Sequence, residues 1–175
     1  MAGLSRFDDA LADFEVAMDL SPLALGLHGA YGYVLLCSGA IERAYQVMRG
    51  SLDELPVSDT AYAAMSISAS LLGRHEDAIN AAKRGYELSS HPMLKAQLGY
   101  ALAAVGEIDE ATRLWSELTQ TTHPIAAPCH VAALAASLGN RSAARDLLEQ
   151  AHAESCPFRF LANYDPRLRS VHSDF

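Results

Sequence analysis

The chain has 175 residues, half of them hydrophobic, and its 13 basic against 21 acidic side chains give a formal net charge of −8. This length and composition suit one domain with a sizeable core. The acidic balance, without any block of Lys or Arg, disfavours nucleic acid and anionic membranes as partners.

Neither export nor membrane insertion is predicted. The first residues, MAGLSRFDDALADFE, lack a basic segment followed by an apolar core, and no later stretch stays apolar for the roughly 18 residues of a membrane helix. The three cysteines, Cys37, Cys129 and Cys156, are widely spaced and form no Cys-x-x-Cys pair. We therefore expect a cytoplasmic protein without disulfides.

A segment that begins at residue 4 recurs with a regular period. It reads LSRFDDA at residues 4–10 and returns as GAIERA, LGRHEDA, VGEIDEA and LGNRSAA. The alanines that close these segments are 34, 34, 33 and 33 residues apart, at Ala10, Ala44, Ala78, Ala111 and Ala144. Glycines recur five residues before the last four of them, at Gly39, Gly73, Gly106 and Gly139. This period is typical of one helix-turn-helix unit per repeat.

Residues 4–22 predict a single helix, the second half of a repeat, with an apolar face formed by Phe7, Leu11 and Phe14. Since no first helix precedes it, part of this face lacks its usual partner. We expect either that the natural chain extends further towards the N-terminus or that a second chain covers the face. One Arg and five acids in residues 1–22 give 1 − 5 = −4, which predicts a solvated face or, alternatively, a docking patch for a basic partner.

Residues 23–156 predict four helix pairs, at about 23–56, 57–91, 92–124 and 125–156. Apolar residues recur at helical spacing on both sides of each glycine, as at Tyr62, Met65, Ala69 and Leu72. The glycine accepts the left-handed conformation that ends the first helix, and the alanine lets the second helix approach closely. Prolines punctuate the periods, at Pro22, Pro56, Pro92, Pro124 and Pro157. The pattern predicts an all-α fold.

This arrangement resembles the tetratricopeptide repeat (TPR) family, which has a small pair in the first helix, an Ala and a bulky residue in the second, and a late Pro. The matching residues of the repeat at 92–124 are Leu98, Gly99, Leu102, Ala111, Trp115 and Pro124. The resemblance covers roughly residues 4–156, with departures at His28, Lys95 and Ala82. It implies a right-handed solenoid of antiparallel helix pairs with about four and a half repeats, and a non-enzymatic protein-interaction function.

Residues 157–175 leave the repeat pattern and predict a C-terminal cap. They are similar to the ends of TPR segments attached to bacterial winged-helix regulators, nucleotide cyclases or kinases. This similarity lies in Pro157, Asp165, Pro166, Arg167, Leu168, Arg169, Ser170, Asp174 and Phe175. It implies an alternative function, in which the chain is the sensory or docking part of a larger bacterial regulator.

The TPR resemblance also implies which residues line the concave groove formed by the first helices. We expect partner binding at Tyr33, Leu36, Thr60, Ile67, Ser70, Met93 and Tyr100. This small, apolar and almost uncharged set suits an apolar peptide or an amphipathic helix. Binding of a peptide carboxylate would need cations and amides, where this chain has Gly29, Tyr33 and Ala63. The alternative is that tight curvature buries these residues as core.

No enzyme, cofactor or metal site is predicted. The sequence contains no Gly-x-Ser-x-Gly elbow, no phosphate-binding glycine loop and no His-Glu-x-x-His helix. His152 and Cys156 are four residues apart, but a closed zinc site needs about four ligands. His91 and His123 precede prolines and are expected in turns. The leading hypothesis is a scaffold that binds a protein or peptide; self-association, including a homodimer through the first helix, is the third possibility.

Overall fold

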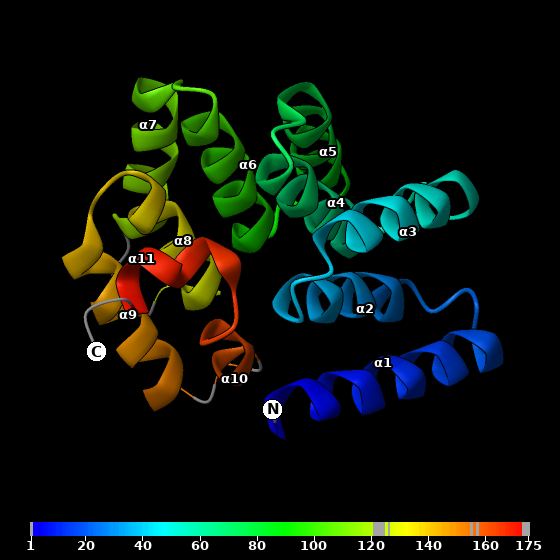
Figure 1. Ribbon diagram of the computed structural model, residues 1–175. Coiled ribbons are helices and arrows are strands. Elements are labelled where there is room, and N and C mark those ends of the chain that lie inside the picture. Colours follow the sequence, from blue (N-terminus) through cyan, green and yellow to red (C-terminus); the bar gives the residue numbers. More distant parts are fainter. Residues whose placement is uncertain (1, 121–124, 126, 155, 157, 173–175) are drawn as a thin grey trace. The chain divides into compact units, whose positions relative to one another are not determined.

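The computed structural model describes residues 2–120, 125, 127–154, 156 and 158–172, and helices are the only regular elements in this part of the chain (Figure 1). The all-α prediction is therefore confirmed. Several residues used in the sequence analysis lie outside the described residues, namely His123, Pro124, Pro157, Asp174 and Phe175.

The chain forms two compact units, residues 1–89 and 90–175. The first contains α1 (Ala2–Leu20), α2 (Leu25–Cys37), α3 (Ile41–Glu54), α4 (Asp59–Leu71) and α5 (His75–Leu88). The second contains α6 (Pro92–Ala104), α7 (Ile108–Thr119), α8 (Pro128–Ser137), α9 (Arg141–Ala153), α10 (Arg159–Ala162), the 3-10 helix η1 (Pro166–Leu168) and α11 (Arg169–His172). The division lies next to the predicted repeat boundary at residue 91, although the sequence did not indicate that the chain separates there.

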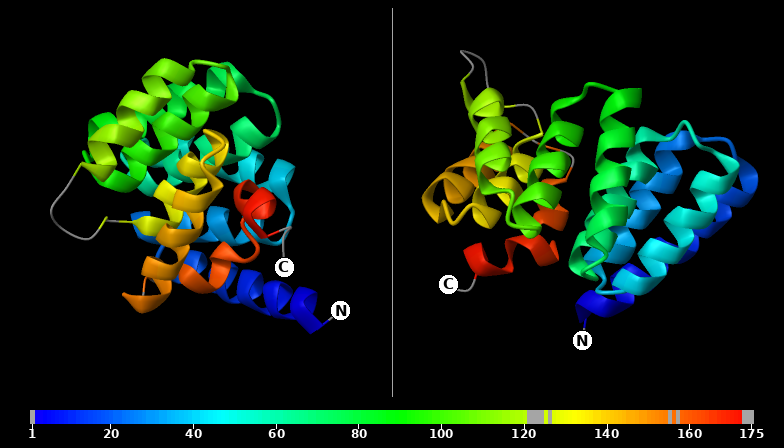
Figure 2. Two further views of the ribbon diagram at one scale, coloured as in Figure 1. Left: turned by 90° about the vertical axis from the view of Figure 1, so that its left-hand side faces the viewer. Right: turned by 90° about the horizontal axis from the view of Figure 1, so that it is seen from above.

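The predicted turn glycines take the conformation that their role requires. Gly39, Gly73, Gly106 and Gly139 have φ of 88°, 72°, 85° and 78°. After each of them the chain reverses, and the next residue donates its amide to a carbonyl five residues back, as Ala40 does to Leu35 at 3.0 Å. This hydrogen bond closes the end of the first helix, so the glycines produce the helix pairs α2/α3, α4/α5, α6/α7 and α8/α9 (Figure 2).

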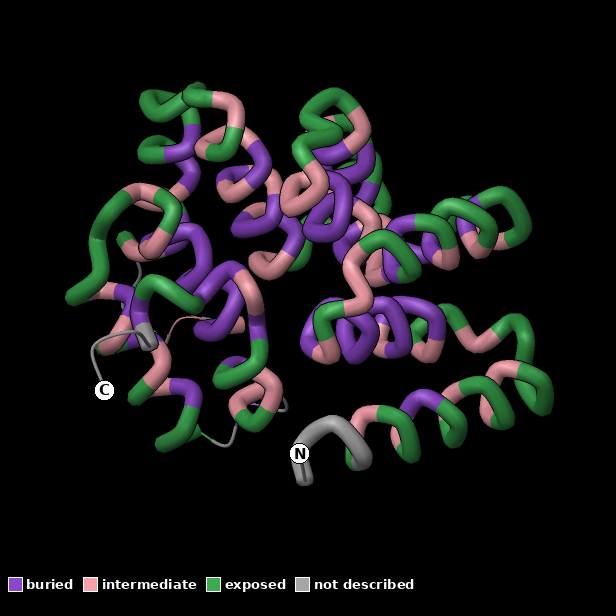
Figure 3. Tube along the Cα trace, viewed as in Figure 1, coloured by how far each residue is buried: buried purple, intermediate pink, exposed green. Residues whose placement is uncertain are grey.

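The first helices of the pairs are the most buried elements. In the first unit α2 packs against α1, α3 and α4, and all its residues from His28 to Cys37 except Ala30 are buried (Figure 3). In the second unit α8 packs against α6 and α9, and every residue from Pro128 to Ala135 is buried. A helix that is apolar on all sides is stable only inside a core.

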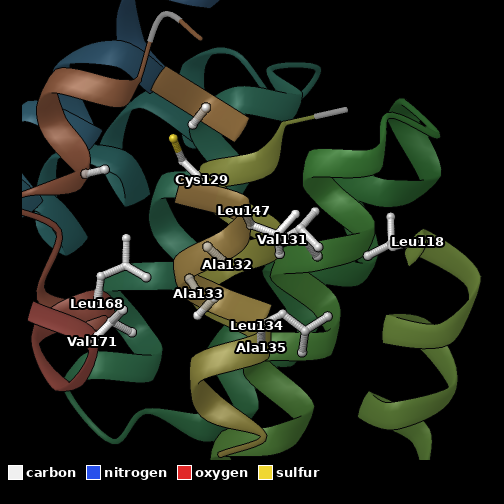
Figure 4. Packing of buried hydrophobic residues seen from close by; sticks show 14 of the residues in the cluster. Leu118, Cys129, Val131, Ala132, Ala133, Leu134, Ala135, Leu147, Leu168 and Val171 are labelled. Carbon is white, nitrogen blue, oxygen red and sulfur yellow. The ribbon is translucent and has the colours of Figure 1, made fainter. Parts of the chain in front are cut away.

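The core of the second unit includes residues from its C-terminal segment, residues 158–172. Figure 4 shows Leu168 and Val171 beside the small side chains of α8, and both belong to one apolar cluster with Ala133 and Leu147. Both side chains of the segment are almost completely buried. The C-terminal segment therefore packs as part of the second unit.

Helices of the first unit approach each other most closely where one of them lacks a side chain. A Cβ atom at Gly29 of α2 would lie 2.7 Å from the carbonyl carbon of Thr60 on α4, and one at Gly32 would lie 2.8 Å from Cβ of Ala64. Since these neighbours are backbone and a short rigid side chain, the helices could not keep this separation with larger residues.

We expect Gly29→Ala to lower the free energy of unfolding by about 1–3 kcal/mol, because the new methyl group overpacks the α2–α4 contact. Gly50→Ala is the matched control, since Gly50 lies in α3 with nothing within 4 Å of its added Cβ. It should raise stability by up to about 1 kcal/mol through helix propensity alone. Urea unfolding of the two variants measures both effects, and equal shifts would contradict the close-contact explanation.

Candidate functional site

The groove residues predicted in the first unit are largely core residues. The exposed fractions of Tyr33, Leu36 and Ile67 are 5%, 1% and 1%. Thr60 and Ser70, at opposite ends of α4, are half-buried, and the Thr60 hydroxyl donates to the carbonyl oxygen of Leu25 at 3.2 Å. Three of these five side chains are thus buried, as expected under the alternative interpretation that they belong to the core.

In the second unit, the groove residues predicted on α6 are Met93 and Tyr100, and Gln97 lies between them at helical spacing on the same side of the helix. Met93 and Tyr100 are half-buried and Gln97 is fully buried. The guanidinium carbon of Arg167 lies 5.5 Å from the centroid of the Tyr100 ring. Arg167 of the C-terminal segment therefore lies over the Tyr100 end of this side of α6.

Arg167 is held there by a buried polar cluster. It forms an ion pair with Asp165 at 2.6 Å, and both side chains are completely inaccessible. Its Nη1 donates to Oε1 of Gln97 at 2.7 Å, and its Nη2 lies 3.4 Å from Nδ1 of His130 on α8. A buried charge needs such a partner and further hydrogen bonds to offset its desolvation.

His130 is uncharged in this buried cluster. Gln97 Nε2 lies 2.7 Å from Nδ1 of this ring. Because the Gln97 and Arg167 groups that face Nδ1 carry only donors, Nδ1 must be the acceptor and carry no proton. Burial, with the Arg167 charge as a further cause, lowers the pKa of His130 to about 3. Desolvation likewise raises the pKa of Tyr100.

Sequence analysis did not identify Gln97 and His130 as members of this cluster. The available signal was a polar residue in a mostly apolar first helix. Gln97 comes four residues after Met93, and His130 directly follows Cys129. Asp165 and Arg167 were noted only for their similarity to regulator tails. The structure shows a local role for Asp165, whose side chain caps η1 by accepting a hydrogen bond from the Arg167 amide at 2.9 Å.

Two cysteines meet inside the second unit. The sulfur atoms of Cys129 and Cys156 are 3.7 Å apart, and both side chains are buried. Burial raises the pKa of Cys129 to about 12, so its thiol stays protonated at neutral pH. His152 is exposed, and in the described part of the chain no group of three or more His, Cys, Asp or Glu could hold a metal.

A small cavity of about 230 Å³ lies between α9 and the C-terminal segment. It is lined by Arg145, Leu148, Glu149, His152, Ala162, Asn163 and Val171. Ligand pockets for small molecules are typically about 300–1,000 Å³, so this cavity is small for a cofactor. Among the residues that the structure describes, no helix has the length and apolar character needed to cross a membrane.

Solved structures with a similar fold are TPR proteins. The chain matches TTC0263, a thermophilic TPR protein of Thermus thermophilus, with a TM-score of 0.64 and 21% identity, over 95% of this chain and 93% of that one. It matches YrrB, described as a TPR protein with an unusual peptide-binding site, with a TM-score of 0.50 and 20% identity, over 93% and 84%. The structure "MamA MSR-1 C2" matches with a TM-score of 0.51 and 18% identity, over 95% and 91%.

No protein-family model and no curated protein matches the sequence. Identities of 18–21% with solved structures show the fold alone. The predicted TPR fold is confirmed on this basis.

Removal of the Arg167 side chain should be strongly destabilising. We expect Arg167→Ala to lower the free energy of unfolding by about 3–5 kcal/mol, because Asp165 would remain as a buried charge without its partner. Arg113→Ala removes an Arg that pairs with Glu110 and Glu117 on the exposed face of α7, and it should leave the urea midpoint nearly unchanged. Similar losses in both variants would contradict the role of the buried cluster.

His130 should make the second unit sensitive to acid. Because its pKa in the folded chain lies below the usual value of about 6.5, the unfolded chain binds more protons at acidic pH. The free energy of unfolding should therefore fall as the pH falls from about 6.5 to 4.5, by up to about 1.4 kcal/mol per unit from this group. In His130→Gln this slope should be shallower. Unfolding curves at several pH values measure it, and an unchanged slope would rule out His130 as a source.

Proposed function

We propose that this chain is a protein-interaction scaffold, without catalytic activity, that binds a segment of a partner protein. The observation that carries the proposal is the TPR fold itself, matched over 95% of the chain by a TPR protein of nearly the same length. Repeated helix pairs of this kind present the faces of their first helices to partners. The peptide-binding site named for YrrB adds support by analogy.

The half-exposed members of the predicted groove are the best candidates for contact with the partner. These are Thr60 of α4 in the first unit and Met93 near the start of α6 in the second. Ser70 of α4 is less suitable, because its hydroxyl oxygen is buried. None carries a charge, so an apolar peptide or an amphipathic helix is the favoured partner. The flexible thioether of Met93 adapts to apolar surfaces of different shape.

The buried members have a different role in this proposal. Tyr33, Leu36 and Ile67 support the first helices from inside, and the C-terminal segment covers Tyr100. The hypothesis that the chain is the sensory or docking part of a larger bacterial regulator stays a prediction. Its main residues, Asp165 and Arg167, have a sufficient role in the packing of the second unit.

The test is selection of binders from a displayed library of random peptides, followed by fluorescence anisotropy on the selected peptides. We expect Met93→Glu to weaken binding at least tenfold, which is about 1.4 kcal/mol, because a charge enters an apolar contact. Ile108→Glu is the control, since Ile108 is an exposed apolar residue at the start of the second helix α7. It should leave binding unchanged. Peptides that bind both variants as well as the unchanged chain would overturn the proposed surface.

A further inference from the structure

The inner face of α1 is fixed to α2 and α3. Leu11 is buried, and the Phe14 ring lies 6.1 Å from the ring of Tyr31 on α2. Glu15 accepts a hydrogen bond from the Tyr31 hydroxyl at 2.8 Å and forms an ion pair with Arg43 of α3 at 2.7 Å. These contacts define which side of α1 faces α2 and α3.

The opposite side carries an apolar stripe that ends in large exposed side chains. Val16 and Leu20 lie one helical turn apart on α1, and Leu23 lies in the loop that follows the helix. Their exposed fractions are 59%, 79% and 75%. Leu25 and Val57 are also exposed, and their segments meet where the Ser58 hydroxyl donates to the Leu25 carbonyl oxygen at 3.1 Å. Several exposed apolar side chains in one region are typical of an interaction surface.

Acidic residues extend this stripe towards the start of the helix. Asp9 and Asp13 precede Val16 at helical spacing on the same side of α1, and Asp8 and Asp19 flank them. All four are exposed, and none of them forms an ion pair within the described part of the chain. Arg43, the cation that α3 brings to α1, is already paired with Glu15. The surface is therefore apolar at one end and negatively charged at the other.

This charge decides between the possible occupants. In a parallel pair with a second copy of the chain, whose residues 1–22 also have a net charge of −4, acids would face acids. In an antiparallel pair, the aspartates of each copy would lie against the apolar end of the other and lose water without gaining a cation. An antiparallel partner helix with apolar residues and a row of Lys or Arg would instead cover the leucines and pair with the aspartates.

We propose that Asp9, Asp13, Val16, Leu20 and Leu23 form a docking surface for a cationic amphipathic helix. The stripe from Asp9 to Leu20 is about 16 Å long, which corresponds to about three helical turns of the partner. Apolar contacts supply most of the affinity, and the charge pairs fix the direction of the partner helix. This surface shares no residue with the faces proposed above for α4 and α6, so either proposal can fail without the other.

The probe is a fluorescent synthetic helix of about 18 residues made of Leu, Lys and Ala, with Leu on one side. Its control replaces each Lys by Glu. We expect the full chain to bind the Lys peptide and not the Glu peptide in anisotropy titrations. Leu20→Ser should weaken binding at least tenfold, and Asp9→Asn with Asp13→Asn should weaken it and reduce its dependence on salt.

Matched variants test whether the effect is local. Ile108→Ser removes an exposed apolar residue elsewhere, and Glu107→Gln with Asp109→Asn removes two exposed acids at the start of α7. Both should leave binding unchanged, and circular dichroism verifies that every variant is folded. The proposal is overturned if the Glu peptide binds equally well or if these variants lose as much affinity as those in α1. It is also overturned if sedimentation shows a dimer that Leu20→Ser dissociates, since a second copy would then cover the surface.

Discussion

The close approach of neighbouring helices, at positions where one of them has no side chain, is the constraint on which both units depend. In the first unit Gly29 and Gly32 let α2 lie against α4, and in the second Gly99 lets α6 lie against Leu134 of α8. Because interiors are packed to crystal-like density, a single added methyl group at such a contact must displace backbone or side chains. The small residues of the first helices are therefore needed for packing, whatever else these helices do.

This packing limits the surface that remains for a partner. A first helix that is buried on nearly all sides, as α2 and α8 are, presents few side chains to solvent. In the second unit the C-terminal segment covers more of the predicted face, where Arg167 reaches Gln97 and lies over Tyr100. Exposed apolar residues are found instead at Val16, Leu20 and Leu23 in and after α1. The docking surface proposed for α1 therefore lies outside the most buried helices.

The polar cluster fixes the C-terminal segment in one position in the second unit, although burying its charges costs desolvation free energy. An ion pair with no solvent access is only stable when its remaining donors and acceptors are also satisfied, and Gln97 and His130 provide this for Arg167. A tail held by leucine and valine alone could slide along α8. The directional bonds of the guanidinium group select one position for it.

The sequence by itself determined the helices, their pairing and the glycine turns, because these depend on local patterns that recur every 33 or 34 residues. The positive φ of Gly39 and its three equivalents follows from the same local signal. Only the tertiary structure decided that Tyr33 and Ile67 are buried and that Arg167 lies on α6, where Gln97 is 70 residues away in sequence. A helical period reports which residues share a face, but what covers that face depends on contacts between distant segments, for which one sequence contains no periodic signal.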